Sequence, residues 1–152
     1  MSAAVHIFTI GFTRKTAEEF FTLLERAGLR RVVDTRLNNV SQLAGFAKKE
    51  DLRFFLKRVC GIDYIHLPEL APTQDMLDAF KKEKGLWADY EKKFVALITQ
   101  RQIEAKVAKE VLHMGCLLCS EDTPEHCHRR LVAEYLQRAW GGGGAVEITH
   151  LV

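Results

Sequence analysis

The most reactive side chains of this sequence lie together in one short segment near the C-terminus. It contains two cysteines, Cys119 and Cys127, with Glu121 between them and His128 and Arg129 directly after. The thiolate is the nucleophilic form of cysteine, and a helix N-terminus and a neighbouring arginine both favour it. The segment therefore predicts a thiol-dependent reaction, with Cys127 as the nucleophile, His128 as its proton partner and Glu121 as an orienting or proton-accepting group.

The same segment allows two other interpretations. Cys116 and Cys119 form a Cys-x-x-Cys pair, and together with Cys127 and either His126 or His128 they offer the ligand types of a zinc site. However, residues three apart in an extended strand face opposite sides, about 10 Å apart. We therefore expect neither a redox pair at Cys116 and Cys119 nor a metal ligand among the site residues. In the remaining interpretation, Cys127 and His128 only pack in the core.

Further polar residues follow the other apolar segments. Arg36 comes just after one of them, where its guanidinium fork suits phosphate or carboxylate, and Asp34 either orients it or forms an internal ion pair. Gly11 permits a tight turn after an earlier segment, and Thr13 offers a hydroxyl group. Tyr64 lies in a third segment and points toward the same edge. We expect an anionic ligand to contact Arg36, Arg129, Asp34, Gly11, Thr13, Tyr64 and Cys119.

Strand-like and helix-like segments alternate along the chain. Thr16 and Glu19 have the form of a capping box, and Thr123 followed by Pro124 predicts an N-cap and a first helical residue. The expected strands cover residues 5–10, 31–35, 64–67, 115–119 and 146–151. The expected helices follow Thr16, Asp51, Thr73 and Thr123 as N-caps, with further helical patterns over 90–98 and 103–111.

This alternation indicates an α/β fold. We predict a single three-layer domain over residues 1–152, with a mostly parallel sheet of about five strands and helices on both faces. In such sheets, ligands bind beyond the carboxyl ends of the strands, close to helix N-termini. Except for Tyr64, which begins its predicted strand, the candidate residues above follow or end predicted strands, so we expect one polar site at this edge.

Composition limits the classes of protein that fit. The 152 residues are 47% hydrophobic and 28% charged, which suits one globular domain and excludes a disordered chain. No apolar run reaches the ~20 residues of a membrane span, and we expect a cytoplasmic protein with reduced cysteines and no membrane partner. With 22 basic and 20 acidic side chains, the net charge of +2 gives no overall attraction to nucleic acid, although a local patch stays open. The sequence gives neither a cofactor nor an oligomeric state.

Several short motifs together resemble one known family. The most specific is the pattern Cys119-x-Glu121-x-x-Pro124-x-x-Cys127-His128-Arg129. The others are Thr9-Ile10-Gly11, Asp34-x-Arg36, Ser41 before Gly45-Phe46, and Tyr64 after Gly61. They resemble the family of small bacterial and archaeal proteins known as domain of unknown function 488, over about residues 5–140. The resemblance implies an α/β fold and no settled activity, and its matching residues fall where the predicted ligand lies.

The sequence thus leads to one main hypothesis and two alternatives. The main hypothesis is thiol-dependent transfer or hydrolysis on an anionic small molecule that carries phosphate or carboxylate. The first alternative is a module that binds a nucleotide or nucleic-acid phosphate without catalysis. The second is a metal site built from cysteine and histidine.

Overall fold

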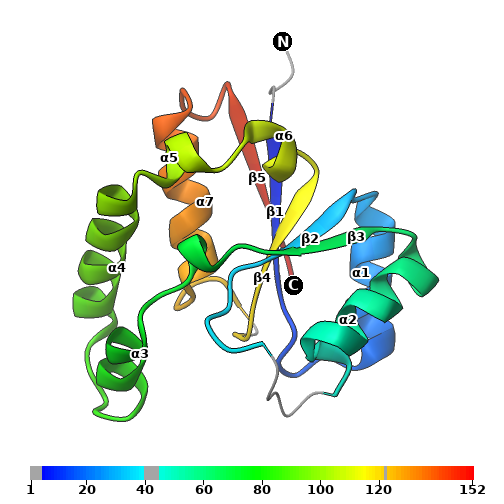
Figure 1. The fold of residues 1–152 in the computed structure, drawn as a ribbon, viewed down its shortest axis with the longest axis horizontal. Coiled ribbons are helices and arrows are strands. Elements are labelled where there is room, and N and C mark those ends of the chain that lie inside the picture. Colours follow the sequence, from blue (N-terminus) through cyan, green and yellow to red (C-terminus); the bar gives the residue numbers. More distant parts are fainter. Residues whose placement is uncertain (1–4, 40–44, 122) are drawn as a thin grey trace.

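The chain forms an open β-sheet with helices on both of its faces (Figure 1). The computed structural model describes residues 5–39, 45–121 and 123–152. Within these residues the sheet has five strands in the order β3-β2-β4-β1-β5, and each neighbouring pair is parallel. This confirms the predicted α/β fold. The strands are β1 (Val5–Gly11), β2 (Arg31–Asp34), β3 (Asp63–His66), β4 (Gly115–Cys119) and β5 (Val146–Leu151).

Local caps begin two of the helices as predicted. The side chains of Thr16 and Glu19 each accept a hydrogen bond from the other residue's backbone N–H, and Thr73 accepts one from the N–H of Met76. Among the described residues, no helix combines the length and apolar character needed to cross a membrane. The helices are α1 (Ala17–Ala27), α2 (Lys49–Phe55), α3 (Gln74–Lys81), α4 (Trp87–Arg101), α5 (Ile103–Lys106), α6 (Lys109–Leu112) and α7 (His128–Ala139). Short helical turns cover Gly45–Ala47, Leu56–Cys60 and Pro68–Leu70.

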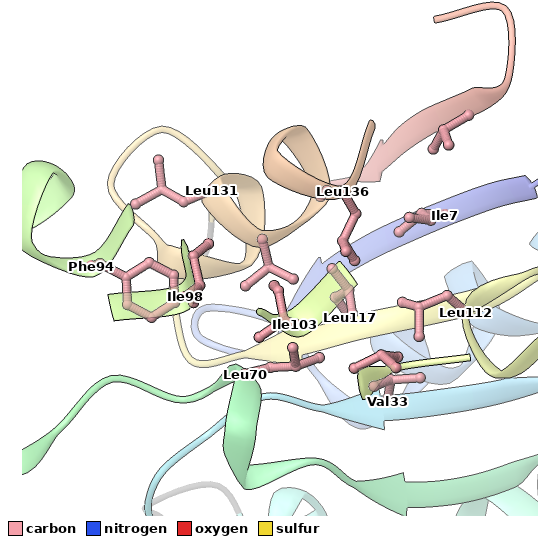
Figure 2. Packing of buried hydrophobic residues seen from close by; sticks show 14 of the residues in the cluster. Ile7, Val33, Leu70, Phe94, Ile98, Ile103, Leu112, Leu117, Leu131 and Leu136 are labelled. Atoms are coloured by element: carbon pink, nitrogen blue, oxygen red, sulfur yellow. The ribbon is translucent and has the colours of Figure 1, made fainter. Parts of the chain in front are cut away.

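Two hydrophobic cores lie on opposite faces of the sheet. One fills the space between the sheet and α4 to α7, and Leu117 of β4, Phe94 of α4 and Leu136 of α7 all belong to it (Figure 2). The other lies against α1 and α2, where Leu118 meets Phe20. Because successive strand residues point to opposite faces, neighbouring residues of β4 enter different cores. The same alternation decides on which side of the sheet each functional candidate lies.

The chain leaves neighbouring strands in opposite directions at the carboxyl edge of the sheet. After β1 and β2 it continues into α1 and α2 on one face, whereas after β4, which lies between them, it continues into α7 on the other face. Such reversals open a crevice beyond the strand ends, where α/β proteins bind ligands. The fold therefore places the ends of β1, β2 and β4, and the start of α7, around one crevice.

Two predicted helix starts are wrong. The last helix begins at His128 with Cys127 as its N-cap, not at Pro124. A turn begins at Pro124 instead, and a hydrogen bond from the N–H of Cys127 to the carbonyl of Pro124 closes it. The prediction fails because proline after threonine suits a turn as well as the first residue of a helix. Helix α2 begins at Lys49, so Asp51 lies in its first turn rather than at its N-cap.

Candidate functional site

A network of charged and hydrogen-bonded side chains lies at the end of β2, and Tyr64 of β3 reaches it with its hydroxyl group. The carboxylate of Asp34 accepts bonds from Nε and Nη2 of Arg36, at 2.9 and 2.8 Å, and from the backbone N–H of Arg36 at 3.0 Å. The hydroxyl of Tyr64 donates to the same carboxylate at 2.6 Å. Asp34 is completely buried and Arg36 is only 3% exposed. The predicted pairing of Asp34 with Arg36 is therefore present as a buried ion pair.

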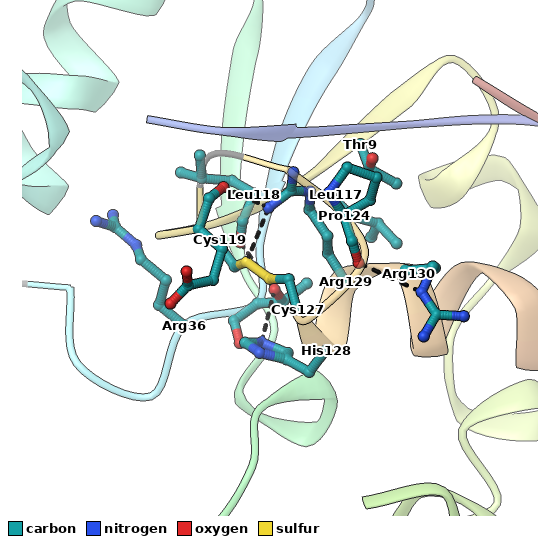
Figure 3. Close-up of a disulfide and its surroundings, with 12 residues drawn as sticks. Thr9, Arg36, Leu117, Leu118, Cys119, Pro124, Cys127, His128, Arg129 and Arg130 are labelled. Carbon is teal, nitrogen blue, oxygen red and sulfur yellow. Dashed lines mark hydrogen bonds between the residues drawn. A yellow bond between two sulfur atoms is a disulfide. The ribbon is translucent and has the colours of Figure 1, made fainter. Parts of the chain in front are cut away.

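This network leaves few donors of Arg36 available. Its Nη1 atom is buried and has no hydrogen-bond partner among the described residues. The guanidinium stacks 5.4 Å from the centre of the Phe12 ring, and in Figure 3 it points away from the sulfur atoms of the site. Burial and the Asp34 charge raise the pKa of Tyr64, which therefore stays protonated as a donor. Nη1 is thus the part of Arg36 that remains for a ligand.

The second group of candidate residues lies on the α7 side of the same edge (Figure 3). Cys119 ends β4, and Cys127 and His128 form the N-cap and first residue of α7. All three side chains are buried, and their sulfur and ring nitrogen atoms lie within 4.8 Å of one another. The structure joins Cys119 and Cys127 as a disulfide, with their Cα atoms 7.3 Å apart. The two cysteines, eight positions apart in the sequence, therefore meet at one point, and the expectation of reduced cysteines is wrong for this pair.

The hydrogen bonds of His128 fix its tautomer. Its Nε2 atom lies 2.8 Å from the carbonyl oxygen and 3.0 Å from the hydroxyl of Thr35, and that hydroxyl donates in turn to the carbonyl of Leu118. Since a carbonyl oxygen only accepts, Nε2 carries the hydrogen and Nδ1 carries the lone pair. Burial lowers the pKa of His128 to about 4, so the ring is neutral at pH 7. A neutral ring offers a lone pair rather than a proton.

Arg129 connects the sulfur atoms to the strand ends. The side chain is completely buried, and Nη1 donates to Sγ of Cys119 at 3.2 Å and to the carbonyl of Glu121 at 2.7 Å. Gly11 allows this approach, since a Cβ atom there would collide with the carbonyl oxygen of Glu121 and lie 2.9 Å from Nη1 of Arg129. The predicted glycine position therefore matters, but for close packing rather than for a tight turn.

Two adjoining cavities lead to these residues. A cavity of about 80 Å³ is lined by Cys119, Cys127 and His128, with aromatic walls from Trp87 and Tyr90. A second, of about 300 Å³, lies between α3 and the segment after β2, and its lining includes Arg36, Leu77, Lys81, Lys82, Ser120 and His128. Leu77, Lys81, Ser120 and His128 line both, so the two cavities meet beside the start of α7.

The remaining predicted residues lie at the margins of the site. The side chain of Glu121 is 41% exposed, forms an ion pair with Lys81 and lines the smaller cavity. Thr13 is exposed, and its backbone N–H donates to the carbonyl of Ser120. Cys116 lies in the core on the opposite face, as the strand geometry predicts, so it cannot share a centre with Cys119.

Sequence reasoning missed three parts of the site. Thr35, which holds His128, stands directly between two predicted site residues, and its place at a strand end was the available signal. Lys81 carries no signal in the sequence, because nothing in its own helix indicates the ion pair it forms with Glu121, forty positions later. The aromatic walls are formed by α4 residues that resemble an ordinary core stripe.

One family model matches the chain, that of domain of unknown function DUF488, over residues 16–136. The chain belongs to this family. The match confirms the resemblance and includes Asp34, Arg36 and the whole segment from Cys119 to Arg129, whereas Ser41 lies outside the described residues. No curated protein and no solved structure matches the chain. Its membership of DUF488 assigns no activity, and any proposed function depends on the site itself.

Proposed function

We propose that this DUF488 protein transfers or hydrolyses a phosphoryl or acyl group of an anionic substrate through the thiol of Cys127. The observation that carries the proposal is the position of Cys127, which caps a twelve-residue helix and lines a cavity beyond the parallel strands. A helix N-terminus favours negative charge on sulfur and on a bound anion alike. In this proposal the Nδ1 lone pair of His128, the next residue, accepts the proton of the thiol.

The charge of the larger cavity supports an anionic substrate. Lys81 lines both cavities and is 52% exposed, so its ammonium group can exchange Glu121 for a substrate anion. In this proposal Arg36 contributes its remaining Nη1 atom, and Asp34 and Tyr64 hold its guanidinium in place. Arg129, whose donors contact Cys119 and Glu121, positions the chain around the thiol.

The proposed reaction has two steps. The thiolate of Cys127 forms a bond to the electrophilic phosphorus or carbonyl carbon, and the bond to the leaving group breaks with its electron pair, after which the leaving group takes up a proton. Water then attacks the same atom, the bond to sulfur breaks, and Cys127 leaves as the thiolate. In this proposal Glu121 accepts the proton of that water. No oxidant or reductant is consumed.

The test uses reduced protein with 4-nitrophenyl phosphate and the succinyl ester of 4-nitrophenol, and with neutral 4-nitrophenyl acetate for comparison. Each assay is run with and without a chelator. We expect release of nitrophenolate from one anionic ester and a covalent adduct on Cys127 by mass spectrometry. C127S should abolish both, and K81M should raise KM about tenfold for the anionic ester only. Equal rates for the wild type and C127S would sink the proposal.

The other cysteines serve as internal controls. Burial, and to a smaller extent the charge of Glu25, raises the pKa of Cys60, and burial raises that of Cys116. Both thiols therefore ionise only at higher pH than an ordinary cysteine, and their labelling at pH 7 should be slow and should rise with pH. A C116A variant should keep the full rate of the wild type.

A further inference from the structure

We infer that in the reduced protein Cys119, Cys127 and His128 bind one divalent ion of the zinc class. This inference goes beyond the proposed function and does not depend on turnover. Of the described residues, these three alone form a group in which ligand atoms of histidine, cysteine or carboxylate side chains gather at ligand spacing. All three are buried, at 1%, 3% and 8% exposure, whereas chance clusters of such groups usually lie on the surface.

The spacing of the backbone suits two thiolates on one ion. The Cα atoms of Cys119 and Cys127 are 7.3 Å apart, whereas disulfides usually have Cα atoms about 4.4–6.8 Å apart. Two sulfur atoms bound to a tetrahedral zinc ion, each at about 2.3 Å, lie about 3.8 Å from each other, so they need a wider backbone separation than a disulfide. Reduction of the disulfide releases both thiols at the place where the histidine already lies.

The surroundings of His128 are those of a metal-binding histidine. Such a ring usually donates its second N–H to a backbone carbonyl or a carboxylate, which fixes its orientation. Here Nε2–H donates to the carbonyl of Thr35, which the fold holds at the end of β2, and Nδ1 keeps the lone pair. Arg129 donates to Sγ of Cys119 and offsets part of the negative charge that two thiolates bring.

The donor set also indicates the class of metal. Two thiolates and an imidazole favour zinc and similar ions over magnesium or calcium, which prefer oxygen ligands. Three protein ligands leave the fourth position of a tetrahedral ion for water or substrate, the arrangement of catalytic rather than structural zinc. The cavity of about 80 Å³ that all three residues line has room for that ligand. A bound thiol is deprotonated outright, so a metal and a nucleophilic Cys127 are compatible.

The experiment measures metal directly, without substrate. Protein purified under reducing conditions is analysed for zinc by mass spectrometry, then stripped with a chelator and titrated with Co²⁺. We expect one equivalent of zinc, and a Co²⁺ spectrum with thiolate charge-transfer bands and the intense visible bands of tetrahedral coordination. C119A and C127A should weaken binding more than about a hundredfold, the upper end of what loss of an outer-sphere partner alone costs.

Matched variants keep the test decisive. C116A removes a thiol from the same strand but the opposite face, and H126Q removes the exposed histidine beside the site, so both should bind as the wild type does. Circular dichroism checks that every variant is folded. Less than about 0.1 equivalent of zinc with a silent Co²⁺ titration overturns the inference, as does full binding by folded C119A.

The two proposals fail separately. A substrate adduct on Cys127 in chelator-treated protein that binds no metal would leave the proposed function standing alone. Zinc binding without any adduct would leave only the metal site.

Discussion

Two polar groups share one edge of the sheet but differ in how their charges are satisfied. On the side of α1 and α2, the carboxylate of Asp34 accepts four hydrogen bonds, three from Arg36 and one from Tyr64. On the side of α7, the sulfur atoms of Cys119 and Cys127 line a cavity. In the first group the carboxylate of Asp34 is fully paired and only Nη1 of Arg36 lacks a partner among the described residues, whereas the second group presents reactive atoms to a space that a small molecule or ion can enter.

The difference suggests a division of roles between the two groups. A buried ion pair fixes the geometry around it, and removing one partner leaves a buried charge unpaired. Sulfur atoms form only weak hydrogen bonds, so their removal costs little stability. We therefore expect variants of the first group to affect folding, and variants of the second to affect chemistry.

The largest effect on stability is expected from breaking the ion pair between Asp34 and Arg36. D34A should lower the free energy of unfolding by about 4 kcal/mol, because the Arg36 guanidinium is left buried without its partner. Urea denaturation followed by circular dichroism measures the loss. D78A, which removes the surface ion pair with Lys82, should cost under about 0.5 kcal/mol. A loss below about 1 kcal/mol for D34A would contradict the division.

The next effect is expected at Gly11, which lies against the backbone of Glu121 and the side chain of Arg129. G11A should cost about 3 kcal/mol, because its Cβ would collide with the backbone of Glu121, which cannot move without disturbing Arg129 and Cys119. G143A, where an added Cβ would meet only Nε2 of Gln137 at an ordinary contact distance of 3.9 Å, should leave the free energy of unfolding within about 0.5 kcal/mol of the wild type. If G11A is as stable as the wild type, the segment after β4 is looser than the structure indicates.

Most of the fold follows from the sequence, because its signals are local. The apolar segments 115–119 and 146–151 are strands with the predicted bounds, and the Thr16 capping box begins its helix as expected. The start of α7 could not be predicted, because Thr123–Pro124 suits both a turn and a helix. In the structure the backbone of Cys127 is extended, so the helix begins only after it. The strand order lay beyond the sequence as well, since the same segments allow several windings.

The place of the candidate residues in the fold was predictable, but their contacts were not. Residues that follow parallel strands meet at one edge whatever the strand order, which brought Asp34, Cys119 and Gly11 together correctly. Which donors remain available depends on partners distant in sequence. Asp34 takes up the Nε and Nη2 donors of Arg36. Lys81 reaches the site only because α3 and the end of β4 line the same cavity. Single-sequence patterns carry no information on such pairings.

The smallest effect on stability is expected for Cys119 and Cys127. It is also the most direct test of the contrast between these cysteines and the Asp34–Arg36 pair. C119A should cost about 1 kcal/mol in reduced, chelator-treated protein, close to the cost of C116A, since Arg129 keeps the Glu121 carbonyl as an acceptor. Denaturation curves measure the loss of stability of C119A and of C116A. Co²⁺ titration, at denaturant concentrations below the unfolding transition, measures metal binding. C119A should lose Co²⁺ binding although it stays folded, whereas D34A should keep binding although it is less stable. If C119A instead unfolds the protein, the sulfur pair is part of the core. If D34A loses Co²⁺ binding while it stays folded, the Asp34–Arg36 pair and the Cys119–Cys127 pair act as one site. Asp34 lies on the other face of the sheet from the proposed metal, so it could affect binding only by changing the geometry that both pairs share.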